Sequence, residues 1–167
     1  YMSKILIIGS TKNKNIDLIY SIATESKDLQ FILVGNYMNS LNLNNFVQYQ
    51  NISEKSLINL YKSSDVLLFP TLSEGFGLPI IEAQHFGLPV ITSKFEPMRS
   101  VAGEGSALFI NPRSKEEIKN AIYLILKNNS TRKTLIKNGL KNVERFRFDL
   151  ILSKYEECYR NISLLND

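Results

Sequence analysis

The segment SEGFGLPIIEAQHFGLPVI, residues 73–91, contains two glutamates, Glu74 and Glu82, and two closely spaced glycines, Gly75 and Gly77, after the first of them. Gly75 and Gly77 allow the backbone to pass close to a ligand and to adopt dihedral angles that other residues resist. Amides in such a loop, followed by a helix N-terminus, point at an anion and favour phosphate. Glu74 and Glu82 would repel phosphate but accept hydrogen bonds from hydroxyl groups, at about 1.5–3 kcal/mol for a charged acceptor. The combination predicts a site for a phosphate group flanked by hydroxyl groups, as in a nucleotide sugar.

The setting of this segment matters more than the spacing of its glutamates. Glu96 and Glu104 are also eight residues apart, in a segment that we do not expect to be a site. Residues 73–78 instead follow an apolar run that ends at Pro70, and a helix is expected to begin near Leu78–Pro79, where proline suits the first turn. Ligands of an open parallel α/β sheet bind beyond the carboxyl ends of its strands. A glycine-rich loop alone is also a common plain turn, so the prediction depends on the two carboxylates.

Short apolar runs alternate with segments of helical period along the chain. Because the apolar runs are continuous rather than alternating, they indicate parallel strands buried on both faces. We expect strands at Lys4–Ile8, Gln30–Val34, Phe46–Tyr49, Val66–Phe69, Pro89–Thr92 and Ala107–Ile110, of which Phe46–Tyr49 is the weakest. This alternation predicts an α/β fold, a Rossmann-like doubly wound parallel sheet of about six strands flanked by helices, in a single domain over residues 1–167.

The helices between these strands carry their own start signals. Ser53 is the expected N-cap of a helix whose apolar face contains Leu57, Leu60 and Tyr61. Ser114 and Glu117 are spaced as a capping box ahead of another apolar series. Further helices are predicted at Asp17–Ser26, Ser130–Glu144 and Leu150–Ser163, and a loop at residues 36–46.

Composition excludes several classes of protein. A hydrophobic content of 44% with 22% charged residues is normal for a globular domain, and no run approaches the roughly 18 apolar residues that span a bilayer. The net charge of +4 is spread along the chain without a recognition motif, so we expect no nucleic-acid partner. Cys158 is the single cysteine, which favours a reducing, cytoplasmic compartment. Neither Cys158 nor the single histidine, His85, has neighbours typical of a metal or catalytic site, so no metal is expected.

Around Glu74 and Glu82 the sequence resembles the C-terminal domain of the group 1 glycosyltransferases (family 4), retaining enzymes of the two-domain GT-B fold. The resemblance runs from Lys4 to about Tyr159 and is strongest in DVLLFPTLSEGFGLPIIEAQHFGLPVITS. It implies that the chain is one half of a GT-B enzyme that binds a nucleoside-diphosphate sugar. Neither a cofactor nor a metal is implied, because positive groups and helix-end amides stabilise the leaving diphosphate.

The resemblance also implies a role for each matching residue. Glu74 would hold hydroxyls of the donor sugar at the reacting centre, as the catalytic residue, and Glu82 would hold the ribose hydroxyls. Lys14, with Lys12 as the alternative, would neutralise the diphosphate beside the first loop. The remaining predicted contacts are backbone and pocket positions: Gly9, Gly35, Asn51 and Ile52 around the nucleotide, and Gly75, Phe76, Gly77 and Leu78 around the sugar and diphosphate. Phe76 would either stack on the ligand or anchor the loop.

Two departures from the family pattern leave an alternative open. Ser10 stands where the family usually has an arginine, and the loop around it is short. The N-terminal domain that binds the acceptor is expected to be missing from this chain, so the chain alone should transfer little or no sugar. The alternative is a non-catalytic nucleotide-binding or interaction module on the same fold. An NAD-type domain is disfavoured because no GxGxxG follows the first strand.

The family suggests where the full enzyme would act. Its members often assemble polysaccharide, lipopolysaccharide or glycolipid, so the predicted setting is cell-envelope polysaccharide synthesis. The full enzyme would then be cytoplasmic, with a peripheral association at the inner face of the membrane. Donor sugar, base and acceptor stay open at this point.

Overall fold

The computed structural model describes residues 2–37 and 43–147, and its sheet has the predicted architecture. Six parallel strands pair in the order β3-β2-β1-β4-β5-β6. Each strand is paired in parallel with its neighbours, and β1 is aligned with β2 over its full length. The strands are β1 (Ser3–Ile8), β2 (Leu29–Val34), β3 (Phe46–Tyr49), β4 (Val66–Phe69), β5 (Val90–Ser93) and β6 (Ala107–Ile110). All six predicted strands are therefore confirmed, each within one residue of its expected start.

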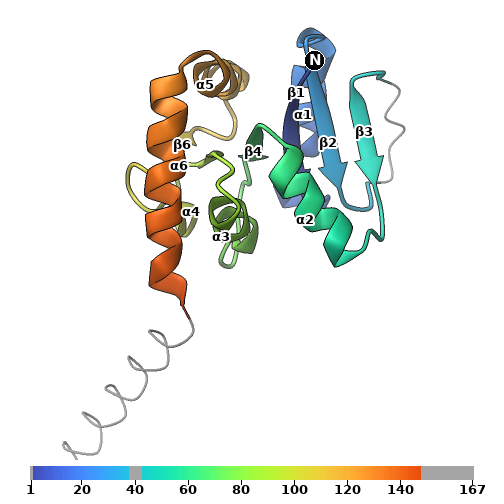
Figure 1. Ribbon diagram of the computed structural model, residues 1–167. Helices are drawn as coiled ribbons and strands as arrows, with labels where there is room; N and C mark the ends of the chain where they lie inside the picture. Colours follow the sequence, from blue (N-terminus) through green and yellow to red (C-terminus); the bar gives the residue numbers. More distant parts are fainter. Residues whose placement is uncertain (1, 38–42, 148–167) are drawn as a thin grey trace, which may run out of the picture.

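Helices cover both faces of the sheet (Figure 1). One face packs against α1 and α5, and the other against α2, α3 and α4, while α6 lies beside α3 and α5. Successive strand residues alternate between the two cores: Ile5 and Ile7 belong to the first and Leu6 to the second. The helices are α1 (Ile16–Glu25), α2 (Glu54–Ser63), α3 (Leu78–His85), α4 (Met98–Ala102), α5 (Lys115–Lys127) and α6 (Asn129–Val143), with 3-10 turns η1 (Lys12–Lys14) and η2 (Glu144–Phe146).

The helix start signals are confirmed in part. The Ser53 hydroxyl accepts the Ser56 amide at 3.2 Å and caps α2 as predicted. The Ser114 hydroxyl likewise accepts the Glu117 amide. The reciprocal half of that capping box is wrong, because the Glu117 carboxylate accepts the Asn111 amide at 2.7 Å instead. The predicted helix Leu150–Ser163 and Cys158 lie outside the described residues.

The strand order places one pair of loops where a ligand is expected. From β1 the chain moves outward through β2 to β3, then returns to the other side of β1 as β4 and continues to β6. The loops after β1 and β4 therefore leave the sheet in opposite directions, at its topological switch point. In open parallel sheets this crevice is where ligands bind. The residues of the two loops, 9–15 and 70–77, include most of the predicted site.

Candidate functional site

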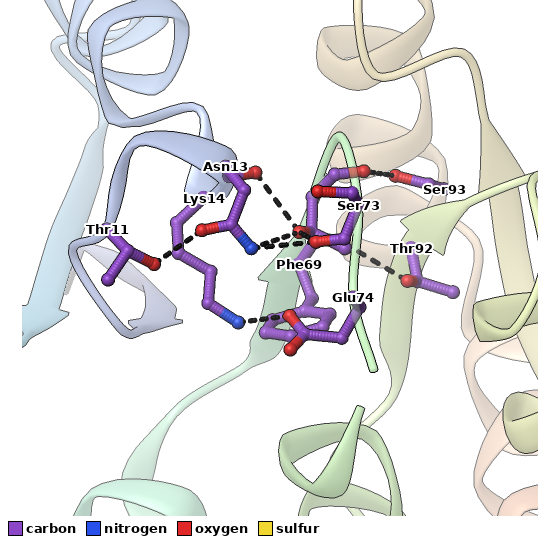
Figure 2. A network of polar contacts seen from close by, with 9 residues as sticks. Thr11, Asn13, Lys14, Phe69, Ser73, Glu74, Thr92 and Ser93 are labelled. Atoms are coloured by element: carbon purple, nitrogen blue, oxygen red, sulfur yellow. Dashed lines mark hydrogen bonds and ion pairs between the residues drawn. The ribbon is translucent and has the colours of Figure 1, made fainter. Parts of the chain in front are cut away.

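The two switch-point loops are joined through Asn13 (Figure 2). The Asn13 carbonyl accepts the Leu72 amide at 2.8 Å and the Thr71 hydroxyl at 3.0 Å. Its side-chain amide donates to the Ser73 carbonyl at 2.7 Å, while the Thr11 hydroxyl donates to its side-chain oxygen at 2.5 Å. Because one residue satisfies groups on both loops, the loops form a single rigid unit.

Buried hydroxyls tie this unit to the next strand. Ser93 donates its hydroxyl to the Thr71 carbonyl at 2.5 Å. Thr92 donates its hydroxyl to the Phe69 carbonyl at 3.1 Å, as Figure 2 shows. Thr71, Thr92 and Ser93 are all fully buried. The loop after β4 is thus supported from beneath by β5, which fixes the positions of the residues that follow it.

Lys14 and Glu74 form the charged pair at the centre of the site. The Lys14 ammonium donates to a carboxylate oxygen of Glu74, and the two side chains are only 13% and 20% exposed. The ammonium also lies 4.3 Å from the centroid of the Phe69 ring, within the range of a cation–π interaction. Lys12, the alternative in the sequence, is exposed and has no such contact with Glu74. The structure therefore favours Lys14 as the lysine of the site.

Gly9 makes room for the Lys14 side chain. Its φ of +90° lies in the region that favours glycine, and its amide donates to the Val34 carbonyl at 2.8 Å. A Cβ at this position would stand 2.8 Å from the Lys14 Cε atom. At Gly35, a Cβ would meet the Gly9 carbonyl carbon at 3.1 Å and the Ser10 Cβ at 2.9 Å. Both predicted glycines are thus required where β1 and β2 end side by side.

The second half of the Glu74 loop leads directly into α3. Gly77 is the N-cap residue with φ of +100°, and proline follows in the first turn as predicted. The first-turn amides of a helix lack intrahelical acceptors and carry its positive dipole end. Gly75 is exposed, with open space where its Cβ would be. The Phe76 ring meets the ring of Phe146 in η2 edge-on, with centroids 5.9 Å apart, so it anchors the loop on η2. Phe76 is still 43% exposed.

Glu82 has a separate set of partners from Glu74. Its carboxylate accepts the Tyr61 hydroxyl at 2.6 Å, in a groove of about 320 Å³ between α2 and α3. Tyr61 is only 2% exposed, and its ring stacks on Phe86 with centroids 5.7 Å apart. Burial, together with the bond to Glu82, raises the pKa of the Tyr61 hydroxyl well above its ordinary value of 10. The single histidine, His85, lines the same groove with its ring edge-on to Phe86.

Like Asn13, Tyr61 is a residue of the candidate site that the sequence analysis missed. It was placed only as an apolar position of the helix that begins after Ser53. The available signal was chemical: a tyrosine on a buried helix face needs a hydrogen-bond partner for its hydroxyl. The nearby acidic residue that supplies this partner comes from α3, which the sequence places 21 residues further on.

Asn51 and Ile52 lie beyond the carboxyl end of β3, which is an outermost strand of the sheet. They follow β3 and precede the Ser53 cap, and Asn51 has φ of +51°. Ile52 and Tyr49 line a hollow of about 310 Å³ at the start of α2. No contact joins either residue to the Lys14–Glu74 pair among the described residues, so the structure unites Gly9, Lys14, Gly35 and Glu74 but leaves these two apart.

Residues 2–37 and 43–147 contain no group of three or more histidine, cysteine, aspartate or glutamate side chains that could hold a metal ion. Over the same residues, no helix combines the length and apolarity needed to cross a membrane.

The fold and site define a class: a Rossmann-like α/β domain with a fixed cation–carboxylate pair and a helix N-terminus at its switch point. The family model of the glycosyl transferases group 1 matches residues 3–142, and the chain belongs to this family. It is 29% identical over 164 residues to the O-antigen biosynthesis glycosyltransferase WclY of Escherichia coli, covering 91% of this chain and 44% of that protein.

Solved structures have the same fold. Sucrose-phosphate synthase from Thermosynechococcus elongatus superimposes with a TM-score of 0.84 at 25% identity, covering 98% of this chain and 46% of that one. The C-terminal domain of the group 1 glycosyltransferase LpcC from Francisella tularensis gives a TM-score of 0.68 at 18% identity, over 92% of this chain and 86% of that one. By length, the chain spans less than half of the WclY protein and less than half of the sucrose-phosphate synthase chain.

Proposed function

We propose that this chain is the donor-binding domain of a retaining, metal-independent glycosyltransferase and that it binds a nucleoside-diphosphate sugar. The observation that carries the proposal is the Lys14–Glu74 pair on two rigidly joined loops at the switch point. An ammonium suits a diphosphate, and a carboxylate beside it suits sugar hydroxyls. A donor presents these two groups next to each other.

Each part of the site has a role in this proposal. Lys14 and the first-turn amides of α3 hold the diphosphate and stabilise the negative charge that develops on it as the sugar leaves. Glu74 accepts hydrogen bonds from the sugar hydroxyls, and the backbone of residues 75–78 lies against the sugar and diphosphate. Glu82, oriented by Tyr61, accepts the ribose hydroxyls. Gly35, Asn51 and Ile52 border the base.

Transfer itself is proposed to require a second domain. The relatives are more than twice as long as this chain, and the family resemblance assigns acceptor binding to the part that precedes the donor domain. Closing a site between two domains excludes water from the reacting centre. The O-antigen relative supports a role in cell-envelope polysaccharide synthesis. We propose the cytoplasmic side of the membrane as the place of that role.

Calorimetric titration tests donor binding directly. UDP, GDP, ADP and their hexose conjugates are titrated into the chain, with inorganic phosphate as the anion control. We expect one nucleotide and its sugar to bind, Lys14→Ala to weaken binding about tenfold or more, and Lys12→Ala to leave it unchanged. Absence of binding by all of them at millimolar concentration contradicts the proposal.

A second assay separates an enzyme from a non-catalytic module. The nucleotide sugar that binds best is supplied to a full-length protein that contains this chain, and to the chain alone. We expect hydrolysis or transfer only by the full-length protein. Tight nucleotide binding with no turnover in the full-length protein would favour the non-catalytic alternative.

A further inference from the structure

We propose that the Lys14–Glu74 ion pair makes the site selective for the sugar-loaded donor over the bare nucleoside diphosphate, because binding requires the two side chains to exchange each other for ligand groups. This inference rests on the proposed function and adds a specificity device to it. The pair, rather than either residue alone, determines which nucleotide species the site retains.

Burial makes the exchange energetically significant. At 13% and 20% exposure, neither charged side chain is surrounded by water when its partner moves away. A partly buried charge that loses its partner is costly, more so than an exposed one. A ligand that binds Lys14 displaces it from Glu74. The ligand must therefore also donate hydrogen bonds to the Glu74 carboxylate, or that carboxylate is left without a partner.

The surroundings keep Lys14 in place while its partner changes. Its ammonium lies 4.3 Å from the Phe69 ring centroid, and its aliphatic chain passes over Gly9. Asn13 holds the two loops together, so the ion pair cannot open by separation of the loops. The exchange is therefore a movement of the Glu74 side chain, whose loop continues into exposed Gly75.

The two ligands differ in what they offer Glu74. A nucleoside diphosphate presents only phosphate oxygens, which bind Lys14 and repel the displaced carboxylate. A nucleotide sugar presents phosphate oxygens to Lys14 and hydroxyl donors to Glu74, so both charges are satisfied. Once the sugar has been transferred, Glu74 loses its hydroxyl partners and competes again for Lys14. The re-formed ion pair then favours release of the spent nucleoside diphosphate.

The test compares binding of the bare diphosphate and of its sugar conjugate. Glu74→Gln removes the competing charge while keeping the shape of the side chain. We expect UDP, GDP or ADP, whichever the wild-type chain binds, to bind Glu74→Gln about 5- to 30-fold more tightly. The affinity gained from the attached sugar should fall in the same variant. Glu104→Gln is the matched control, because Glu104 is also paired with a cationic side chain, that of Arg99, but is 75% exposed. Its affinities should match wild type.

The affinities of wild type and Glu74→Gln for the bare diphosphate decide whether Lys14 and Glu74 exchange partners on binding. Equal or weaker binding of the bare diphosphate by Glu74→Gln, with normal binding by wild type, overturns the exchange and leaves the proposed function intact. Absence of nucleotide binding by both the wild-type chain and Glu74→Gln overturns the exchange and the proposed function together. Glu74→Ala gives a second measurement if the glutamine variant misfolds, and we expect the same direction of change. Thermal melting confirms that each variant is folded.

Discussion

Removing the Tyr61 hydroxyl should weaken recognition of the ribose without disturbing the core. Tyr61→Phe keeps a buried ring stacked on Phe86 and deletes only the bond to Glu82 at 2.6 Å. Hydrogen bonds to charged groups contribute about 1.5–3 kcal/mol. Glu82 is exposed and regains water, so we expect a loss at or just below the lower limit of that range, about 1–1.5 kcal/mol. For a chain of this size that lowers the melting temperature by about 2–6 °C.

Nucleotide binding gives the sharper measurement of the same variant. If Tyr61 orients Glu82 toward the ribose, the ribonucleotide should lose about 3- to 10-fold in affinity, because one hydrogen bond to a carboxylate is weakened. The 2′-deoxy form already lacks one of these hydroxyls and should lose less. Calorimetric titration of both forms gives the ratio of the affinity for the ribonucleotide to that for the 2′-deoxynucleotide. We expect this ratio to move toward one in Tyr61→Phe.

Two results would contradict the proposed role of Tyr61 in orienting Glu82. Equal losses for the ribonucleotide and the 2′-deoxynucleotide would show that Tyr61 acts through general stability. Unchanged affinity for both would show that Glu82 does not contact the ribose. Tyr123→Phe is the matched control, because it also removes a hydroxyl that donates to a carboxylate, that of Asp28 at 2.8 Å, on the opposite side of the sheet. Its melting temperature should fall slightly and its nucleotide binding should not change.

Three further predictions follow from the same contacts. The raised pKa of Tyr61 keeps its hydroxyl neutral in the folded chain, whereas in the unfolded chain it ionises near pH 10, so the free energy of unfolding should fall above pH 10. This fall should be less steep in Tyr61→Phe. Melting temperatures of both proteins from pH 8 to 11 measure the difference, and the same pH dependence in both would contradict it. Gly9→Ala should lower the free energy of unfolding by about 1–2 kcal/mol because of the positive φ at this position. Its methyl group should also displace Lys14 and weaken diphosphate binding. Gly75→Ala, which has open space at its Cβ, should melt within about 2 °C of wild type. Asn13→Ala should lower stability by about 1 kcal/mol and weaken nucleotide binding as the loops separate, which melting and titration together detect; unchanged binding would show that the loops need no clamp.

Much of the fold could be predicted from the sequence because each strand is a continuous apolar run. Both faces of β1 are buried, so Ile5, Leu6 and Ile7 are all apolar and the strand stands out from its polar flanks. The elements that were missed are short. The turn η1 has three residues and α4 has five, which is too few to show a helical period.

The candidate site divides in the same way. Gly77 and Glu74 could be predicted as site residues because a glycine loop after a buried strand has a recognisable pattern. The choice between Lys12 and Lys14 depended on which side of η1 faces Glu74, and that orientation is set by Asn13 contacts across the switch point. Tyr61 could not be linked to Glu82 from spacing, because the bond joins two helices on opposite sides of β4 in the chain order.

The most direct test of the central claim is to map the bound donor on the chain by ¹H–¹⁵N NMR. The nucleotide sugar selected by titration is added stepwise, and amide shifts are followed at each residue. We expect the largest changes at residues 9–14 and 74–78, with smaller ones around Glu82 and none along α5. Changes confined to α5 and α6, with the two switch-point loops unaffected, would contradict the claim that these loops bind the donor.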